Sequence, residues 1–209
     1  MKESIISFFQ APISNKRPAS YCSVAALHQY ITHNERLKAL TEEVRQCLDN
    51  REVYRRKKLQ LLPYVSPAGV FSYCNAEGLI FPSGDYVVDL DGLPSFEEAC
   101  RLRDELIADP VLHADLAFVS PSARGVKLFV PYRLTIDLPF KEVFRRALEC
   151  SWTYIEGVYG VQVDHANADI CRGCIVCYDP ERKIDYAKCR LIKKNQQVKS
   201  QLFYQKLKF

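Results

Sequence analysis

The chain has 209 residues, of which 48% are hydrophobic and 26% charged, and its formal net charge is +4 at pH 7. These values are ordinary for a soluble globular protein, and the length suffices for a hydrophobic core without disulfides or metal ions. No apolar run approaches the roughly 18–20 residues of a membrane-spanning helix, and the N-terminus lacks a signal-peptide pattern. We therefore expect a cytoplasmic protein whose 9 cysteines stay reduced.

The first part of the chain, residues 1–62, has mainly helical patterns. Ser20 is a candidate cap for a helix through residue 33, and Asn34 for a second helix through residue 48. A third helix is expected over residues 51–61, before Pro63. We therefore predict a helical N-terminal segment over residues 1–62.

The pattern changes after residue 62, where short β-rich runs alternate with Gly and Pro. The expected order is strands, helix, two strands, helix and two final strands, which predicts an α+β or α/β core over residues 63–187. The expected strands are 70–73, 78–81, 86–90, 114–120, 125–131, 158–163 and 174–178, and the expected helices are 95–108 and 139–156. A basic tail over residues 188–209 completes the predicted organisation.

Two carboxylates lie at the end of one predicted strand, in the stretch Tyr-Val-Val-Asp-Leu-Asp-Gly. The alternation of side chains along a strand places Asp89 and Asp91 on one face, about 6–7 Å apart. Such a pair suits Mg²⁺ or Mn²⁺, which prefer oxygen ligands. Two solvated acids at a strand end remain the alternative.

A polar turn between two predicted strands is the second candidate. Its residues are Ser120, Ser122, Arg124, Gly125 and Lys127, where the glycine permits a positive φ. Hydroxyls, backbone N–H groups and two cations would converge there on an anion such as a triphosphate. The spacing is not that of a Walker A loop, and an ordinary polar hairpin remains the alternative.

A cysteine run near the C-terminus contains Cys171, Cys174 and Cys177. A regular strand cannot point all three thiolates at one zinc ion, and the fourth cysteine of a ferredoxin run is missing. We therefore expect these cysteines to pack in the core rather than bind metal. Asp164 and Arg172 in the same stretch are stronger candidates for a shared cleft.

Lys and Arg gather in two stretches, residues 55–58 and the tail after residue 187. Such blocks can neutralise nucleic-acid phosphates, but taken alone they are better explained by a solvated face and a loose tail.

The order and spacing of these motifs resemble the archaeo-eukaryotic primase (primase-polymerase) superfamily. The closest resemblance is to the bacterial mobile-element family called "VirE N-terminal". It rests on a loose match from Lys58 to Phe71, Asp-x-Asp at residues 89–91, Ser-Pro-Ser-x-x-Gly-x-Lys at 120–127, and Asp164 followed by Arg172 and Tyr-Asp-Pro at 178–180.

The resemblance implies an RRM-like mixed sheet with flanking helices and a two-metal nucleotidyltransferase. Asp89, Asp91 and Asp164 would be the catalytic metal ligands, and Mg²⁺ or Mn²⁺ the cofactor. Nucleotide phosphates would be bound by Ser120, Ser122, Arg124, Gly125, Lys127 and Arg172. Lys127 stands where the superfamily usually has histidine.

Nucleoside triphosphates and a single-stranded DNA or RNA template are the partners expected for such an enzyme, together with a helicase-like domain or protein. A catalytically silent nucleic-acid-binding module and a nucleotide-binding regulatory domain are the alternatives.

Overall fold

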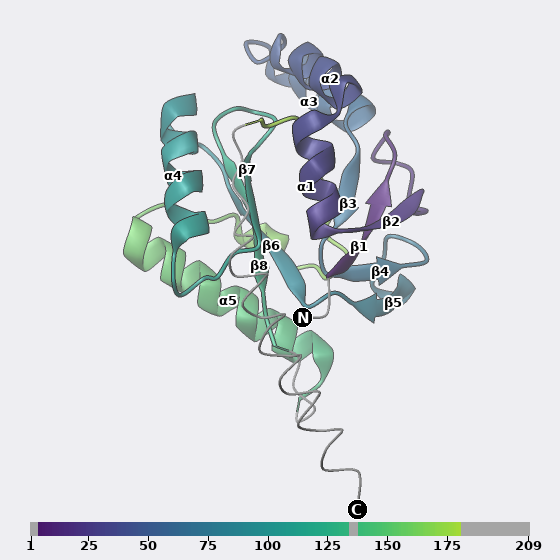
Figure 1. The fold of residues 1–209 in the computed structure, drawn as a ribbon, viewed down its shortest axis with the longest axis vertical. Coiled ribbons are helices and arrows are strands. Elements are labelled where there is room, and N and C mark those ends of the chain that lie inside the picture. Colours follow the sequence, from purple (N-terminus) through teal and green to yellow (C-terminus); the bar gives the residue numbers. More distant parts are fainter. Residues whose placement is uncertain (1–3, 134–137, 181–209) are drawn as a thin grey trace, which may run out of the picture.

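A three-stranded antiparallel sheet forms the centre of the protein in the computed structural model, which describes residues 4–133 and 138–180 (Figure 1). Its strand order is β6–β8–β7, with β6 at Asp85–Leu90, β7 at Leu116–Val119 and β8 at Val126–Pro131. All three strands are rich in Val, Leu and Phe, the residues that fit a sheet buried on both faces. The register places Asp89 opposite Lys127 and Leu90 opposite Val126.

Two helices cover one face of this sheet, α4 at Phe96–Ala108 and α5 at Phe140–Tyr159 (Figure 1). Alternate strand residues such as Val88, Leu90 and Leu128 point into the core beneath them. The helices contribute residues at helical spacing, including Leu102 and Leu106 of α4.

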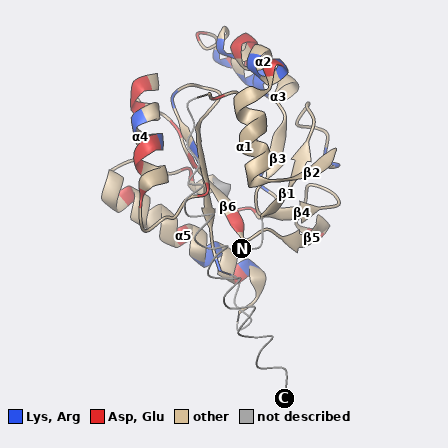
Figure 2. Ribbon diagram, in the orientation of Figure 1, with Lys and Arg blue, Asp and Glu red and all other residues tan. Residues whose placement is uncertain are grey.

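The other face packs against a four-stranded antiparallel sheet of order β2–β1–β3–β9, with helix α1 at Val24–His33 and helix α2 at Glu35–Arg45. The strands are β1 at Ile5–Phe9, β2 at Ser20–Ser23, β3 at Tyr64–Ser66 and β9 at Cys174–Ile175. Val87 and Phe129 of the central sheet meet Ile6 and Leu27 in this second core. Figure 2 shows α1 without charged residues, and its buried side chains Val24, Leu27 and Ile31 belong to this core.

The remaining elements lie at the edges. Helix α3 spans Arg51–Leu61 and contacts α2, whereas β4 (Gly69–Phe71) and β5 (Leu79–Pro82) form a separate antiparallel pair. Single 3₁₀ turns occur at Ala76–Gly78 and His165–Asn167. Within the described part of the chain, no helix is long and apolar enough to cross a membrane.

The α+β class is confirmed, but several expectations were wrong. Ser20 starts β2 rather than a helix, and Ser23 caps α1 by accepting a hydrogen bond from the Ala26 N–H. Residues 1–62 therefore contain two strands besides three helices. The described strands pair antiparallel in separate sheets, where we expected a mixed sheet.

The expected strand 158–163 is also absent, because α5 continues to Tyr159 and ends at Gly160 with φ 64°. The predicted basic tail, residues 188–209, lies outside the described residues.

Candidate functional site

A cleft of about 840 Å³ opens beside the end of β6. One side of it is formed by the end of β6 with residue 92, the turn before β8 with Lys127, and the segment 164–173. The other side is formed by α3 and residues 13–16, and Tyr64, Cys74 and Ile175 complete the lining. Of the nine residues predicted for the site, all but Gly125 line this cleft, and the Gly125 carbonyl accepts a hydrogen bond from the N–H of one of them, Ser120, at 2.9 Å.

Asp89 and Lys127 form a buried ion pair on the cleft wall. The β6–β8 register places them opposite each other, and Lys127 Nζ donates a hydrogen bond to Asp89 Oδ2. The two side chains are 15% and 9% exposed. Burial alone would lower the pKa of Lys127, but the carboxylates of Asp89 and Asp91 outweigh it and raise that pKa above its ordinary value. Lys127 is therefore a permanent cation that neutralises Asp89.

The second oxygen of the same carboxylate, Asp89 Oδ1, is buried and has no hydrogen-bond partner among the described residues. Asp91, one residue beyond β6, is exposed to the cleft. Its pKa is raised, first by loss of surrounding water and then by repulsion from Asp89, while Lys127 and Lys58 oppose the rise. Asp89 thus offers one carboxylate oxygen that accepts no hydrogen bond. Asp91 offers a carboxylate that binds a proton more readily than an ordinary aspartate.

The turn after β7 is compact and internally bonded. Ser120 Oγ and Ser122 Oγ lie 2.8 Å apart, and the Arg124 guanidinium donates to the Leu93 carbonyl at 2.8 Å. The positive φ expected at Gly125 is instead taken by Ala123, at 59°. Gly125 has a different role, because a Cβ there would lie 2.5 Å from Asp91 Oδ1 and 2.9 Å from Ser120 Oγ. A glycine at this position lets the acidic strand end and the serine turn come into contact.

Asp164 joins this group through its backbone. Its N–H donates to the Asp89 carbonyl at 3.1 Å, and its Oδ1 accepts from the Ala166 N–H at 3.0 Å. Arg172 Nη2 lies 3.8 Å from Asp164 Oδ2. Both side chains are about 40% exposed, at 39% for Asp164 and 42% for Arg172, so the pair can rearrange around a ligand at little cost.

Helix α3 contributes a wall of the cleft that the sequence patterns did not mark as part of a site. Its lining residues are Arg51, Tyr54, Arg55, Lys58 and Leu59, which share one helix face at spacings of three and four. In the sequence, the cations of residues 55–58 stand out as a charged run, and Lys58 also begins the loosely matched stretch over residues 58–71. Their helical spacing was a usable signal, because it separates Arg55 and Lys58 from the two residues between them.

The three cysteines of the C-terminal run are not neighbours in one site. Cys174 and Cys177 are buried in the core between the two sheets, whereas Cys171 is half-buried against the other core. Burial raises the pKa of Cys174 and of Cys177 to about 12, so both are uncharged thiols at neutral pH. The Cys177 thiol donates to the Val119 carbonyl at 3.1 Å.

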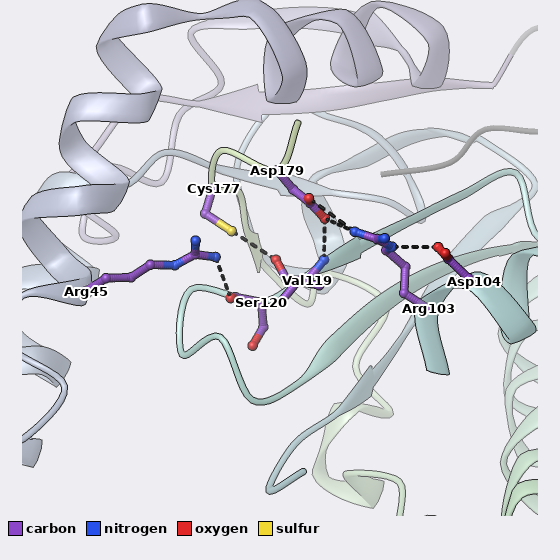
Figure 3. Close-up of polar contacts among 7 residues, drawn as sticks. All are labelled: Arg45, Arg103, Asp104, Val119, Ser120, Cys177 and Asp179. Atoms are coloured by element: carbon purple, nitrogen blue, oxygen red, sulfur yellow. Dashed lines mark hydrogen bonds and ion pairs between the residues drawn. The ribbon is translucent and has the colours of Figure 1, made fainter. Parts of the chain in front are cut away.

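The segment after the cysteines is fixed by a buried ion pair (Figure 3). Asp179 accepts from Arg103 Nη1 at 3.2 Å and, through Oδ2, from the Val119 N–H at 2.8 Å. On the other side, Arg45 donates to the Ser120 carbonyl at 3.4 Å. These contacts hold the end of β7, and hence the serine turn, between α2 and the C-terminal segment.

The carboxylates of the cleft meet part of what a hard divalent cation needs. The oxygen ligands and the buried Asp89 Oδ1 without a donor suit Mg²⁺ or Mn²⁺. Over residues 4–133 and 138–180, however, no group of three or more His, Cys, Asp or Glu side chains is close enough to hold a metal ion. Asp89 and Asp91 supply two carboxylates at this point, and Asp164 is joined to Asp89 through its backbone.

The fold and the cleft define an α+β domain with a charged site at the end of its central sheet. The sequence matches the family described as "BT4734-like, N-terminal domain" over residues 56–182. The match covers more than half of the 209 residues, and the chain belongs to this family. Neither the curated proteins nor the solved structures contain a match to it.

Proposed function

We propose that this chain is a primase-polymerase-like nucleotidyltransferase domain that adds nucleotides along a single-stranded template, in the replication of a mobile element. On this proposal the family is related to the primase-polymerase superfamily and to the "VirE N-terminal" domains. The observation that carries the proposal is that Asp89, Asp91 and Asp164 line one cleft together with the serine turn and Arg172. A helicase-like partner fits the same role.

The chain's own residues would divide the work in the cleft. Asp89 Oδ1 and Asp91 would hold a Mg²⁺ or Mn²⁺ ion, with Asp164 beside them. A bound divalent cation would lower the pKa of the attacking 3′-hydroxyl and neutralise charge on the leaving pyrophosphate. Ser120, Ser122 and Arg124 would orient the nucleotide, and Arg172 would exchange Asp164 for a phosphate oxygen.

Lys127 has a specific part in this scheme. Its ammonium group is bound to Asp89 and lies within the wall, so it would fix the orientation of the Asp89 carboxylate. The ion pair offers a reason why lysine can replace the usual histidine of the superfamily at this position.

The test is nucleotide incorporation by the purified chain on primed and unprimed single-stranded templates, with Mg²⁺ or Mn²⁺. We expect Asp91→Asn to reduce incorporation by about 100-fold or more, because several kcal/mol of charge stabilisation are lost. Asp169→Asn is the matched control, since Asp169 lines the same cleft but holds no metal in the proposal. If no product forms with Mg²⁺ or with Mn²⁺, or if Asp91→Asn is fully active, the proposed nucleotidyltransferase activity is refuted.

A catalytically silent nucleic-acid-binding module is the second candidate. It is favoured by the ion pair, because Lys127 already neutralises the carboxylate that a metal would need. This module would bind single strands with a strong dependence on salt and none on divalent metal, and Asp91→Asn would leave binding intact.

A further inference from the structure

We propose that the cleft-facing side of α3, together with Lys16, binds the triphosphate of the incoming nucleotide. The proposal rests on the function above and deepens it. It assigns the main phosphate contacts to Lys16, Arg51, Arg55 and Lys58. Of these, only Lys58 belongs to a stretch in the resemblance to the primase-polymerases, the loose match over residues 58–71.

The orientation of α3 separates its cations into two groups. Arg51, Arg55 and Lys58 line the cleft. Lys57, by contrast, forms an ion pair with Glu43 of α2 at 2.9 Å, and Arg56 is exposed and does not line the cleft. The helix thus directs three of its five cations into the cleft, at positions one turn apart.

The charges of the cleft do not balance. Its lining contains 7 Lys or Arg and 4 Asp side chains. Lys127 and Arg172 form ion pairs with Asp89 and Asp164. Within the described part of the chain, Lys16, Arg51, Arg55 and Lys58 take part in no ion pair of 4.0 Å or less, which leaves an excess of positive charge for a polyanion.

The positive wall faces the carboxylates across the cleft. Burial, and then repulsion from Lys127, lower the pKa of Lys58, whereas attraction to the carboxylates of Asp91 and Asp89 acts to raise it. Lys58 therefore lies within electrostatic range of the carboxylates. A metal-bound triphosphate placed between the two walls would have the cation on the acidic side and its remaining charge on the α3 side. The volume, about 840 Å³, suits a mononucleotide-sized ligand.

The wall is also held in place before any ligand binds. The Asn50 side chain caps α3 by accepting from the Val53 N–H at 3.1 Å, and the Leu59 carbonyl accepts from the Ile13 N–H at 2.8 Å. The Lys16 carbonyl accepts from the Cys74 N–H at 2.8 Å. Such preorganisation reduces the entropy that binding would otherwise cost.

The experiment measures binding of inorganic tripolyphosphate and of dATP to the full chain by calorimetry, with EDTA present so that metal contributes nothing. We expect Arg55→Ala and Lys58→Met each to weaken tripolyphosphate binding about tenfold, the effect of losing one charge-assisted hydrogen bond. Arg56→Ala is the matched control, with the same change of charge on the same helix, and should change the affinity less than twofold.

Three results would overturn the assignment: no tripolyphosphate binding by the unaltered chain, unchanged binding by the Arg55 and Lys58 variants, or an equal loss in Arg56→Ala. If the Arg55 and Lys58 variants lose binding of a single-stranded oligonucleotide while their tripolyphosphate binding is unchanged, this face of α3 binds the nucleic-acid backbone instead of the triphosphate. If tripolyphosphate binding depends on α3 but no nucleotide is incorporated, the phosphate site stands and the catalytic proposal fails. Nucleotide incorporation with an unchanged KM in both variants would instead support the catalytic proposal and refute the phosphate site.

Discussion

Gly125 shows how one missing side chain positions a site. A Cβ at this residue would meet the Leu90 carbonyl at 2.5 Å as well as Asp91 and Ser120. The serine can rotate, but the backbone carbonyl belongs to the β6–β8 ladder and cannot move without breaking the register. The glycine therefore serves close approach rather than a left-handed turn.

We expect Gly125→Ala to destabilise the protein by about 1–3 kcal/mol, the usual cost of overpacking, and to weaken ligand binding in the cleft. Gly157→Ala is the matched control, since it lies in α5 with nothing within 4 Å of its Cβ and should stabilise by about 0.5–1 kcal/mol. Urea unfolding measures both. Equal effects of the two changes would contradict the role assigned to Gly125.

Asp85, at the opposite end of β6, is a buried carboxyl group that makes the stability of the protein depend on pH. It is 0% exposed, and neither carboxylate oxygen has a hydrogen-bond partner among the described residues. Burial, and then repulsion from Asp115, raise its pKa to about 7, against a smaller opposing effect of the Ser4 hydroxyl. The folded protein therefore binds a proton at Asp85 that the unfolded chain releases near pH 4.

Because the folded state holds this proton more tightly, its stabilising effect is present at acidic pH and is lost as pH rises towards 7. Asn cannot ionise, so the Asp85→Asn variant should not lose this stability. We expect the difference in unfolding free energy between the variant and the unaltered protein to shift in favour of the variant by roughly 2–3 kcal/mol from pH 5 to pH 8. Urea unfolding at the two pH values checks this. A stability difference that is independent of pH would show that Asp85 does not titrate in this range.

At the scale of elements, α3 is unusual because it has no buried residue. Only partly buried side chains, such as Tyr54 and Leu61, reach the core. Short helices gain most of their stability from packing, so α3 depends more than the other helices on its Asn50 cap and on the Lys57–Glu43 pair.

We expect Asn50→Ala to cost about 1 kcal/mol, to speed amide exchange in the first turn of α3 and to weaken tripolyphosphate binding. Ser95→Ala is a suitable control, because Ser95 caps α4 in the same way, accepting from the Glu98 N–H at 3.2 Å, but α4 does not line the cleft. Hydrogen exchange followed by mass spectrometry would distinguish the two. If Ser95→Ala weakens tripolyphosphate binding and Asn50→Ala does not, α3 does not position the phosphate-binding side chains.

The elements that could be predicted are those with local signals. Asn34 caps α2 as expected, through the Leu37 N–H at 2.8 Å, and α3 has the predicted bounds. The missed strands β1 and β3 are short and take their stability from partners far along the chain: Phe8 pairs with both Ser20 and Val65. Such pairing depends on tertiary contacts, which periodicity does not record.

At the scale of the whole molecule, Asp164 follows α5 and joins the site through its backbone hydrogen bond to Asp89. Asp89, Asp91 and the serine turn come together because β6 and β7 end, and β8 begins, at one side of the central sheet. That convergence could be anticipated from strand ends. For α3, the spacing of Arg55 and Lys58 could show that they share a helix face. The place of that face beside the cleft could not be predicted, because it depends on how the helix packs against α2. The ion pair of Lys127 and Asp89 likewise follows from the β6–β8 register, and only the paired strands show it.

The buried pair of Arg103 and Asp179 sets a boundary for anyone who shortens this protein. A fragment that stops before residue 179 would remove the buried partner of the Arg103 guanidinium, which is 2% exposed, and leave it only the partly exposed Asp104. Breaking a buried ion pair in this way is strongly destabilising. The shortened chain would also free the Val119 N–H beside the serine turn. Loss of ligand binding by such a fragment would report a damaged fold, and only fragments that reach beyond Asp179 can say which segments the cleft itself requires.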